Sequence, residues 1–339
     1  MIDSRRTTPL GKQIVVTGAA GFIGSHLVDA LTERGCQVVG VDRRNVTDDP
    51  FAAMNLAVAA ENPQVRIVHA DLAEADLAEV VAGADTVFHL AAVPGVRTSW
   101  GDRFPDYVRS NITATHRLLT ACEQQGVRRL VIASSSSVYG TSTAPSREQD
   151  PTGPLSPYGV TKLAAEQLCL AHASRADTAL SVVALRYFTV YGPRQRPGMA
   201  INQLLLSALT GAVIPLYGDG RQRREFTFVS DVVTATLAAA EAGVKAAVVN
   251  VGGGTSITMR QAIQLAGEVT GRPVAVAELD DQAGDVRATE ADLTLAGRVL
   301  GYRPAVELHD GMAAQAAWLT ALTDTQRHSL LRDQLAVTR

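Results

Sequence analysis

The stretch TGAAGFIG, residues 17–24, decides how the first half of the chain is expected to fold. It follows an apolar run of β-strand type at residues 13–16. It precedes residues 25–31, whose apolar positions recur at helical spacing. A strand, a glycine-rich turn and a helix in this order predict a dinucleotide-binding site, although such a turn can also be purely structural.

Each glycine of this turn has a predicted role. Gly18 would let the chain turn tightly off the strand, Gly21 would let a pyrophosphate approach the backbone, and Gly24 would let the helix pack closely. The free N–H groups at the start of the helix would then face the phosphate charge. The spacing is G-x-x-G-x-x-G, not the G-x-G-x-x-G of most two-domain dehydrogenases.

Asp42 ends the second apolar run, residues 36–41, at the distance expected for an acid that binds the adenosine ribose. A carboxylate at this place repels a 2′-phosphate and therefore favours NAD over NADP. Arg43 and Arg44 follow directly, and NADP sites use a nearby arginine. The sequence thus favours NAD without excluding NADP.

Composition bounds the class of protein. A chain of 339 residues with 46% hydrophobic residues predicts one large domain or two coupled domains with a sizeable core. A formal net charge of −3 gives no general attraction to nucleic acid. Apolar runs stay below the roughly 18–20 residues that span a membrane. We therefore expect neither a nucleic-acid nor a membrane partner.

The cysteines and the ends of the chain point to the cytoplasm. The three cysteines are far apart and lack the spacing of metal ligands, so no metal site is predicted and they are expected to be free thiols in a reducing compartment. Residues 1–6 lack the apolar core of a signal peptide. They and the polar end after about Thr325 are expected to be loose tails.

Strands and helices alternate through the first half. Strands are predicted at residues 65–68, 86–92, 129–133 and 179–187, and helices at 50–60, 104–125 and from Pro157 onward. This rhythm predicts an α/β fold with a Rossmann-type, doubly wound parallel sheet. Ligands of such sheets bind at the carboxyl ends of the strands. The residues predicted to cluster there are Gly18, Asp42, Ala91, Ser135 and Tyr187.

The rhythm changes after Tyr187, where proline and glycine become frequent. We predict a smaller mixed α/β substrate-binding domain from about residues 189–228 plus 253–339. The remaining residues, 1–188 plus about 229–252, would form the NAD-binding domain.

The segment YGVTK, residues 158–162, is the second key motif. Ser156 is a good N-cap and Pro157 fits the first helical position. Tyr158 and Lys162 would therefore lie on one helix face. A free tyrosine has a pKa near ~10, so a tyrosine base at pH 7 needs about three units of help, roughly 4 kcal/mol. A neighbouring ammonium group supplies help of that sign.

Four serines, residues 134–137, follow the strand predicted at 129–133. They are poor core material, and their hydroxyls are predicted to point into the cleft. The alternative is a serine turn that satisfies its own backbone.

In this order, the motifs at residues 17–24, 42, 89–92, 134–140, 158–162 and 186–193 resemble the extended short-chain dehydrogenase/reductase family. The resemblance covers about residues 12–320. Within the family, the chain resembles the NAD-dependent nucleotide-sugar epimerases and dehydratases. It implies that Tyr158 is the base, that Lys162 is its pKa partner and a ribose ligand, and that Ser135 bonds the sugar O4. It also implies tightly held NAD and a homodimer formed through the helices at 104–125 and 157–174. The implied cofactor-binding residues are Gly18, Gly21, Phe22, Ile23, Gly24, Asp42, Arg43, Asp71, Leu72, Leu90, Ala91, Ala92, Tyr158, Lys162 and Tyr187.

Within the family, the serine run is informative. The 4,6-dehydratases carry an Asp-Glu pair where this chain has Ser136 and Ser137, and the UDP-glucuronate decarboxylases carry Glu at the second of these places. UDP-glucose 4-epimerases usually have Asn where this chain has Thr189. Residues 95–97, 135–140 and 188–200 together resemble UDP-glucuronate 4-epimerases, although residues 93–94 read Val-Pro where those relatives often have Gln-Ala.

A uronate substrate needs local cations on a protein of net charge −3. Arginine pairs with carboxylate or phosphate through two hydrogen bonds. We predict that Arg196 helps to hold the sugar carboxylate and that Arg224 and Arg287 bind the diphosphate. The predicted substrate-binding residues are Ser135, Ser136, Ser137, Thr189, Arg196, Arg224, Arg287 and Arg97.

The predicted reaction is the reversible C4 epimerisation of UDP-glucuronate to UDP-galacturonate. It would pass through a 4-keto intermediate with transient reduction of bound NAD. The alternatives left open are a UDP-glucose 4-epimerase, a UDP-glucuronate decarboxylase and a non-catalytic NAD-sensing relative.

Overall fold

The computed structural model describes residues 10–11, 13–142, 145–280, 286–323, 325–327 and 330. The predicted loose start, residues 1–6, lies outside these ranges, as does most of the chain after Thr325.

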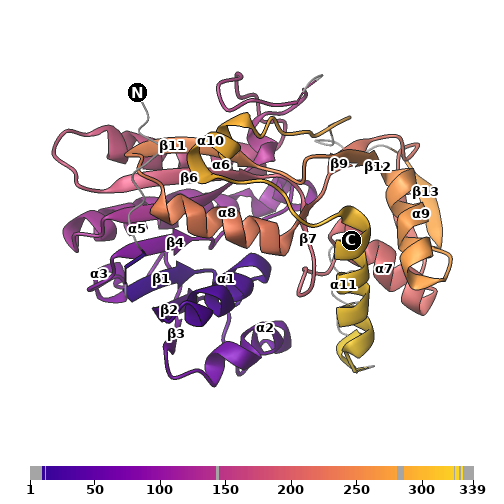
Figure 1. The fold of residues 1–339 in the computed structure, drawn as a ribbon, viewed down its shortest axis with the longest axis horizontal. Coiled ribbons are helices and arrows are strands. Elements are labelled where there is room, and N and C mark those ends of the chain that lie inside the picture. The colour runs from indigo at the N-terminus through magenta and orange to yellow at the C-terminus, as the bar shows by residue number, and fades with distance from the viewer. Residues whose placement is uncertain are drawn as a thin grey trace.

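Among the described residues, seven parallel strands form the central sheet, in the order β11-β6-β5-β4-β1-β2-β3 (Figure 1). This order confirms the predicted Rossmann-type α/β fold. The strands are β1 (Gln13–Thr17), β2 (Gln37–Asp42), β3 (Val65–His69), β4 (Thr86–His89), β5 (Arg129–Ser135), β6 (Ser181–Tyr187) and β11 (Ala246–Val251).

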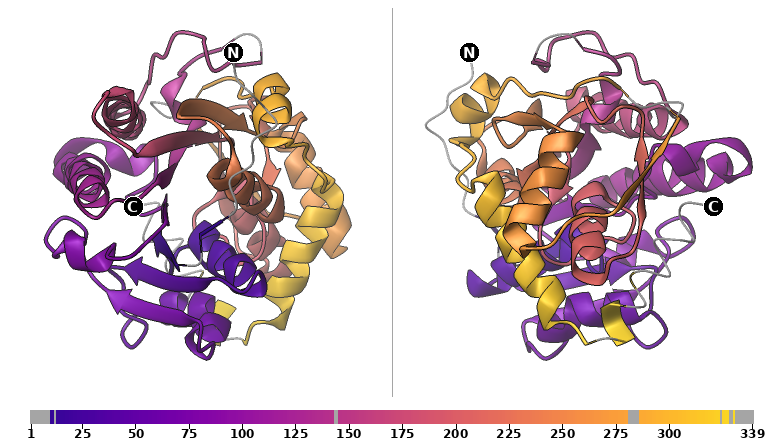
Figure 2. Two further views of the ribbon diagram at one scale, coloured as in Figure 1. Left: turned by 60° about the vertical axis from the view of Figure 1, so that its left-hand side comes forward. Right: turned by 90° about the vertical axis from the view of Figure 1, so that its right-hand side faces the viewer.

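Two layers of helices cover the two faces of the sheet (Figure 2). One apolar cluster joins the sheet to α1 (Phe22–Glu33), α2 (Pro50–Ala60), α8 (Val229–Glu241) and α10 (Thr294–Leu300). The other joins it to α3 (Leu77–Val80), α5 (Ala114–Gln124) and α6 (Pro157–Ser174). The inner strands are buried on both faces, which explains why they read as apolar runs without alternation, whereas the edge strand β3 exposes Arg66 and His69.

Residues after β6 build a third apolar cluster beside the carboxyl edge of the sheet (Figure 1). In it α7 (Ala200–Thr210) packs against α9 (Met259–Thr270) and α11 (Leu308–Ala321). Its short strands are β7 (Val190–Tyr191), β8 (Ile214–Tyr217), β9 (Arg223–Glu225), β10 (Thr227–Phe228), β12 (Ser256–Thr258) and β13 (Val276–Leu279). The chain returns to the first part through α8 and β11. The division into a cofactor domain and a substrate domain remains a prediction about function.

Two predicted elements differ in length or regularity. β4 ends at His89, before the predicted Ala92, and residues 90–92 form a loop, although the N–H of Leu90 still bonds the Thr17 carbonyl of β1 at 3.1 Å. The helix predicted at residues 104–125 consists of α4 (Phe104–Tyr107), a π-helical turn η3 (Val108–Thr113) and α5.

Candidate active site

The glycine turn lies between the end of β1 and the start of α1, and its geometry excludes side chains. Gly18 has φ +73°, and a Cβ there would lie 2.7 Å from the backbone nitrogen of Ala91. A Cβ on Gly24 would collide with the Gly18 carbonyl oxygen. Helix α1 has Gly21 as its N-cap, without a side-chain capping bond, so its first N–H groups are available to an anion. This cradle fits the pyrophosphate of a dinucleotide.

Asp42 lies beside this turn at the carboxyl end of β2. One carboxylate oxygen accepts a hydrogen bond from the Ala20 N–H at 3.0 Å, and the other accepts one from the Arg44 N–H, also at 3.0 Å. The Arg44 guanidinium lies 3.4 Å from both oxygens. The Arg43 side chain is exposed. Because the Arg44 guanidinium is paired with Asp42, the site fits an unphosphorylated ribose better than a 2′-phosphate.

Asp71 and Leu72, which the resemblance implies as cofactor-binding residues, follow β3. Although burial works in the opposite direction, the Ala73 N–H and the Arg109 guanidinium lower the pKa of Asp71. Arg109 Nη1 lies 2.8 Å from the Asp71 carboxylate. Leu72 is buried. Leu90, Ala91 and Ala92 form the half-buried loop after β4, facing the glycine turn.

Tyr158 and Lys162 lie on α6, which begins as the sequence predicts. The Ser156 hydroxyl caps the helix by accepting the Gly159 N–H at 3.1 Å, and Pro157 is the first helical residue. Tyr158 is hydrogen-bonded to Ser135, the last residue of β5, at the carboxyl edge of the sheet. The structure therefore brings Ser135 and the candidate base together.

The charges around Tyr158 differ from the prediction in one respect. Burial raises the pKa of Tyr158, while the hydrogen bond to Ser135 and the positive charge of Arg196 oppose that rise. Arg196, which was predicted only to hold the substrate carboxylate, is thus a cation that acts on Tyr158. The effect of Lys162 on the pKa of this tyrosine stays a prediction. Lys162 is buried, and burial lowers its own pKa to about 8.

The structure adds two residues that interact with α6. Asn111, in η3, donates to the Val93 carbonyl and to the Thr161 hydroxyl, both at 3.0 Å, and the Thr161 hydroxyl donates to the Tyr158 carbonyl at 2.8 Å. His89 is buried, and burial together with the Lys162 charge lowers its pKa to about 3. Its imidazole is therefore neutral at pH 7. The π-turn that directs Asn111 inward leaves no pattern in the sequence that could have revealed it.

The serine run is divided between two environments. The Ser134 hydroxyl donates to the buried carboxylate of Glu166 at 2.7 Å, so the prediction that all four hydroxyls face the cleft is wrong for Ser134. Ser135 Oγ accepts the Ser137 N–H at 3.1 Å, and Ser136 and Ser137 are half-buried in the short turn η4 (Ser136–Val138). The local turn that was the alternative reading thus coexists with the Ser135–Tyr158 bond.

Arg196 reaches the catalytic helix from the loop between β7 and α7. The loop is tied to α1 twice: Arg194 pairs with Asp29 at 2.7 Å, and the Pro193 carbonyl lies 2.9 Å from His26 Nε2. Burial lowers the pKa of Arg196, and its charge interacts with Tyr158, Tyr107 and Arg44. The loop therefore carries a cation from the second part of the chain to the candidate base. Thr189, also predicted to bind substrate, is half-buried directly after β6.

The other predicted arginines lie elsewhere in the second part. Arg224, on β9, donates to the Val286 carbonyl at 2.7 Å, and the Arg287 carbonyl accepts the Arg223 N–H at 2.8 Å. Arg224 and Arg287 are thus on adjacent segments. Arg97 stacks on the Tyr217 ring, 4.1 Å from its centroid, and joins the loop after β4 to β8.

Tyr187 contributes to the core more than its place at a strand end suggested. Its ring belongs to the main apolar cluster, and its hydroxyl lies 2.7 Å from the Thr236 hydroxyl of α8. Any contact with a cofactor would therefore come from its backbone or ring edge.

The described residues show no features of a metal site. In the described ranges, no three His, Cys, Asp or Glu side chains are placed to hold a metal ion. No described helix combines the length and apolarity of a membrane span.

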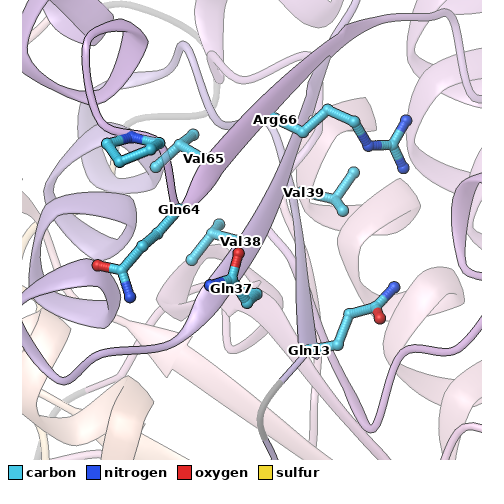
Figure 3. A pocket seen from close by; sticks show the side chains of 8 residues that line it. Gln13, Gln37, Val38, Val39, Gln64, Val65 and Arg66 are labelled. Atoms are coloured by element: carbon cyan, nitrogen blue, oxygen red, sulfur yellow. The ribbon is translucent and has the colours of Figure 1, made fainter.

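A cavity of about 310 Å³ lies at the opposite, amino edge of β1, β2 and β3, lined by polar Gln13, Gln37, Gln64 and Arg66 among others (Figure 3). Because ligands of doubly wound sheets bind at the carboxyl edge, we do not assign the site to this cavity.

Comparison with known proteins agrees with this geometry. The profile described as "NAD dependent epimerase/dehydratase family" matches residues 14–252. A Bacillus subtilis (strain 168) protein named as an uncharacterized UDP-glucose epimerase, YtcB, is 40% identical over 91% of this chain and 98% of its own length.

Two solved proteins are similar over nearly the whole chain. MoeE5, solved in complex with UDP-glucuronic acid and NAD, is 46% identical with a TM-score of 0.84, covering 91% of this chain and 99% of its own. A second structure of MoeE5 contains UDP-glucose and NAD. UDP-glucuronic acid 4-epimerase from Bacillus cereus, in complex with UDP-glucuronic acid and NAD, is 38% identical with a TM-score of 0.87, covering 92% of this chain and all of its own.

Proposed function

Because the chain belongs to the NAD-dependent epimerase/dehydratase family, we propose that it interconverts UDP-glucuronate and UDP-galacturonate by inverting C4 of the sugar. The broader class, an NAD-dependent nucleotide-sugar 4-epimerase, rests on the family and on the relatives just described. That the substrate is a uronate is what we propose beyond this broader class. It is supported by one observation above all: the Arg196 guanidinium acts on Tyr158, beside serines where dehydratases would carry acids.

The chain's own residues supply the proton transfer. Tyr158 would take the proton of the C4 hydroxyl and return it after the ring has turned, while Ser135 holds the same oxygen. Bound NAD would supply the acceptor, and afterwards the donor, of the C4 hydride. The residues that would hold it include the glycine turn, Asp42 for the ribose and Lys162 beside the base.

A clamp on the carboxylate explains how the product would stay intact. The 4-keto form of a uronate is a β-keto acid, which loses CO2 when the breaking bond aligns with the ketone π system. Arg196, the hydroxyls of Ser136 and Ser137, and Thr189 would fix the carboxylate out of that alignment. Control of orientation can contribute several kcal/mol. For comparison, holding reacting groups in a well-oriented position lowers a barrier by about 7–11 kcal/mol.

Product analysis tests the substrate. Purified protein is incubated separately with UDP-glucuronate and UDP-glucose, and the sugar nucleotides are separated by anion-exchange chromatography. We expect UDP-galacturonate from the first, with at least about tenfold higher kcat/KM than for UDP-glucose. A preference for UDP-glucose, or release of CO2 with a pentose nucleotide, would contradict the proposal.

A second candidate function, UDP-glucose 4-epimerase, has specific support. A relative at 40% identity is named as an uncharacterized UDP-glucose epimerase, and the protein at 46% identity was solved with UDP-glucose as well as UDP-glucuronic acid. The same assay separates the two, because only the uronate has a carboxylate that a nearby cation can bind.

We also propose a homodimer that forms through the outer faces of α4 and α6. The two helices are in contact, and each carries an exposed apolar side chain, Phe104 at 38% and Val160 at 47% exposed. Light scattering after size exclusion should give twice the chain mass, and Val160→Glu should shift it towards the monomer. A monomer at every concentration would refute this arrangement, and Val58→Glu, at an exposed position on α2, serves as the control.

A further inference from the structure

Helix α6 carries a third titratable residue on the same face as Tyr158 and Lys162. Tyr158, Lys162 and Glu166 follow one another at four-residue spacing, on one face of the helix. Glu166 is fully buried, with none of its surface exposed. Its carboxylate accepts hydrogen bonds from Ser134 Oγ at 2.7 Å, Arg186 Nε at 3.0 Å and Arg186 Nη2 at 2.6 Å. The catalytic helix is thus attached to the sheet by a buried ion pair.

The partners of Glu166 immediately precede site residues. Ser134 and Arg186 are opposite each other in the β5–β6 pairing, one position before Ser135 and Tyr187. The Glu166 carboxylate therefore links α6 to the last residues of both strands. It fixes the distance between the helix that carries Tyr158 and the strand that carries Ser135.

The far side of Arg186 is held equally firmly. Its guanidinium lies 4.6 Å from the Tyr139 ring centroid and donates to the Glu148 carbonyl at 3.2 Å. The Tyr139 hydroxyl donates to Asn250 Oδ1 at 2.7 Å. A buried ion pair rarely stabilises a fold more than apolar residues of the same volume would. Stability alone therefore does not account for this pair, whereas exact placement of α6 does.

Lys162 also depends on Glu166. The groups that act on the Lys162 ammonium are the Cys169 thiol and Glu166 on its own helix and the His89 ring on β4. Burial raises the pKa of the Cys169 thiol and lowers that of His89, so both are neutral near pH 7. Glu166 is then the negative charge that opposes the cost of burying the ammonium.

We propose that Glu166 is a positioning residue of the reaction: its carboxylate holds α6 so that Tyr158 meets Ser135, and its charge stabilises the Lys162 ammonium. The proposal rests on the proposed epimerase function only for its kinetic readout. Its electrostatic half can be measured without any substrate.

The chain offers a direct measurement, because Lys12, Lys162 and Lys245 are its three lysines. Protein labelled with ¹³C-lysine is titrated by NMR, and the Lys162 signal is assigned by its loss in Lys162→Met. In the wild type we expect a midpoint near pH 8. In Glu166→Gln we expect it about one unit lower, since a charge one helical turn away is removed. The Lys245 signal serves as the internal reference.

Kinetics of the holoenzyme test the positioning half, with whichever sugar nucleotide the wild type epimerises. Glu166→Gln should lower kcat at least about tenfold with KM changed less than about threefold, and its pH–rate profile should move to lower pH with Lys162. Ser134→Ala should lower kcat without moving the profile, because it removes a hydrogen bond and no charge. Glu166→Asp keeps the charge and should restore the wild-type midpoint, with kcat still reduced.

Arg129→Gln is the matched control, since Arg129 is a buried arginine at the other end of β5 that bonds the Ala242 and Val244 carbonyls. It should lower the melting temperature without changing kcat or the Lys162 midpoint. If folded Glu166→Gln keeps the wild-type midpoint and kcat, the proposal is wrong. If that variant does not fold, Glu166→Asp and Ser134→Ala decide: unchanged kcat in both refutes it. A wild type inactive on both sugars refutes the proposed function and leaves the NMR result standing.

Discussion

Replacing Tyr158 by Phe is expected to lower kcat by about 10³-fold, because the variant keeps the ring and loses the hydroxyl that would carry the proton. KM and the binding of NAD should change little, since the ring still packs edge-on against Tyr107, 6.3 Å between centroids. Steady-state kinetics at saturating sugar nucleotide and a fluorescence titration with NADH measure the two effects separately.

The control for this variant removes the hydroxyl of a buried tyrosine on another part of the chain. Tyr302→Phe deletes the hydrogen bond to the Gly252 carbonyl, 2.8 Å in the structure, and should cost stability with kcat preserved. If Tyr158→Phe retained more than about a tenth of wild-type kcat, Tyr158 would not be the base.

Replacing Arg196 by Met is expected to have the second largest effect, and it should depend on the substrate. The loss of a buried cation that pairs with a carboxylate should lower kcat/KM for UDP-glucuronate about 100-fold, or roughly 2.7 kcal/mol. For UDP-glucose the loss should stay below about tenfold, because that sugar has no carboxylate to pair. Equal losses on both substrates would remove Arg196 from the uronate site.

The same variant should shift the pH dependence. Arg196 lowers the pKa of Tyr158 against the effect of burial, so its removal raises that pKa further. The base is active above its pKa, and the acidic limb of kcat/KM should therefore move to higher pH. Arg196→Lys keeps the charge and should retain the wild-type limb while losing the two-fold hydrogen bonding of a guanidinium. An unmoved limb in Arg196→Met would contradict this effect on the base.

Much of the fold could be predicted because its signals are local. The glycine turn, the apolar runs of β1 to β6 and the capped start of α6 each lie within a few consecutive residues. Local periodicity and capping act within one element, so they are visible in the sequence. The π-turn at η3 is an exception, since no residue pattern marks where a helix gains an extra residue in one turn.

The serine run shows where local reasoning fails. Ser134 and Ser135 are the last two residues of β5, and α6 passes over both of them. The Ser134 hydroxyl meets Glu166, and the Ser135 hydroxyl meets Tyr158, two turns earlier on the same helix. The sequence predicted a strand that ended at Ala133, and so it could not assign the two serines to different partners.

The sequence by itself determined the dinucleotide turn, the parallel sheet and the Tyr158–Lys162 pair, because each depends on spacing along one segment. Only the tertiary structure decided which cation acts on the base and which acid lies behind it. Arg196 is 38 residues from Tyr158, and Arg186 is 20 residues from Glu166 on another element. Electrostatic interactions depend on distance in space and on burial, and for residues on different elements only the packing of loop, strand and helix fixes both.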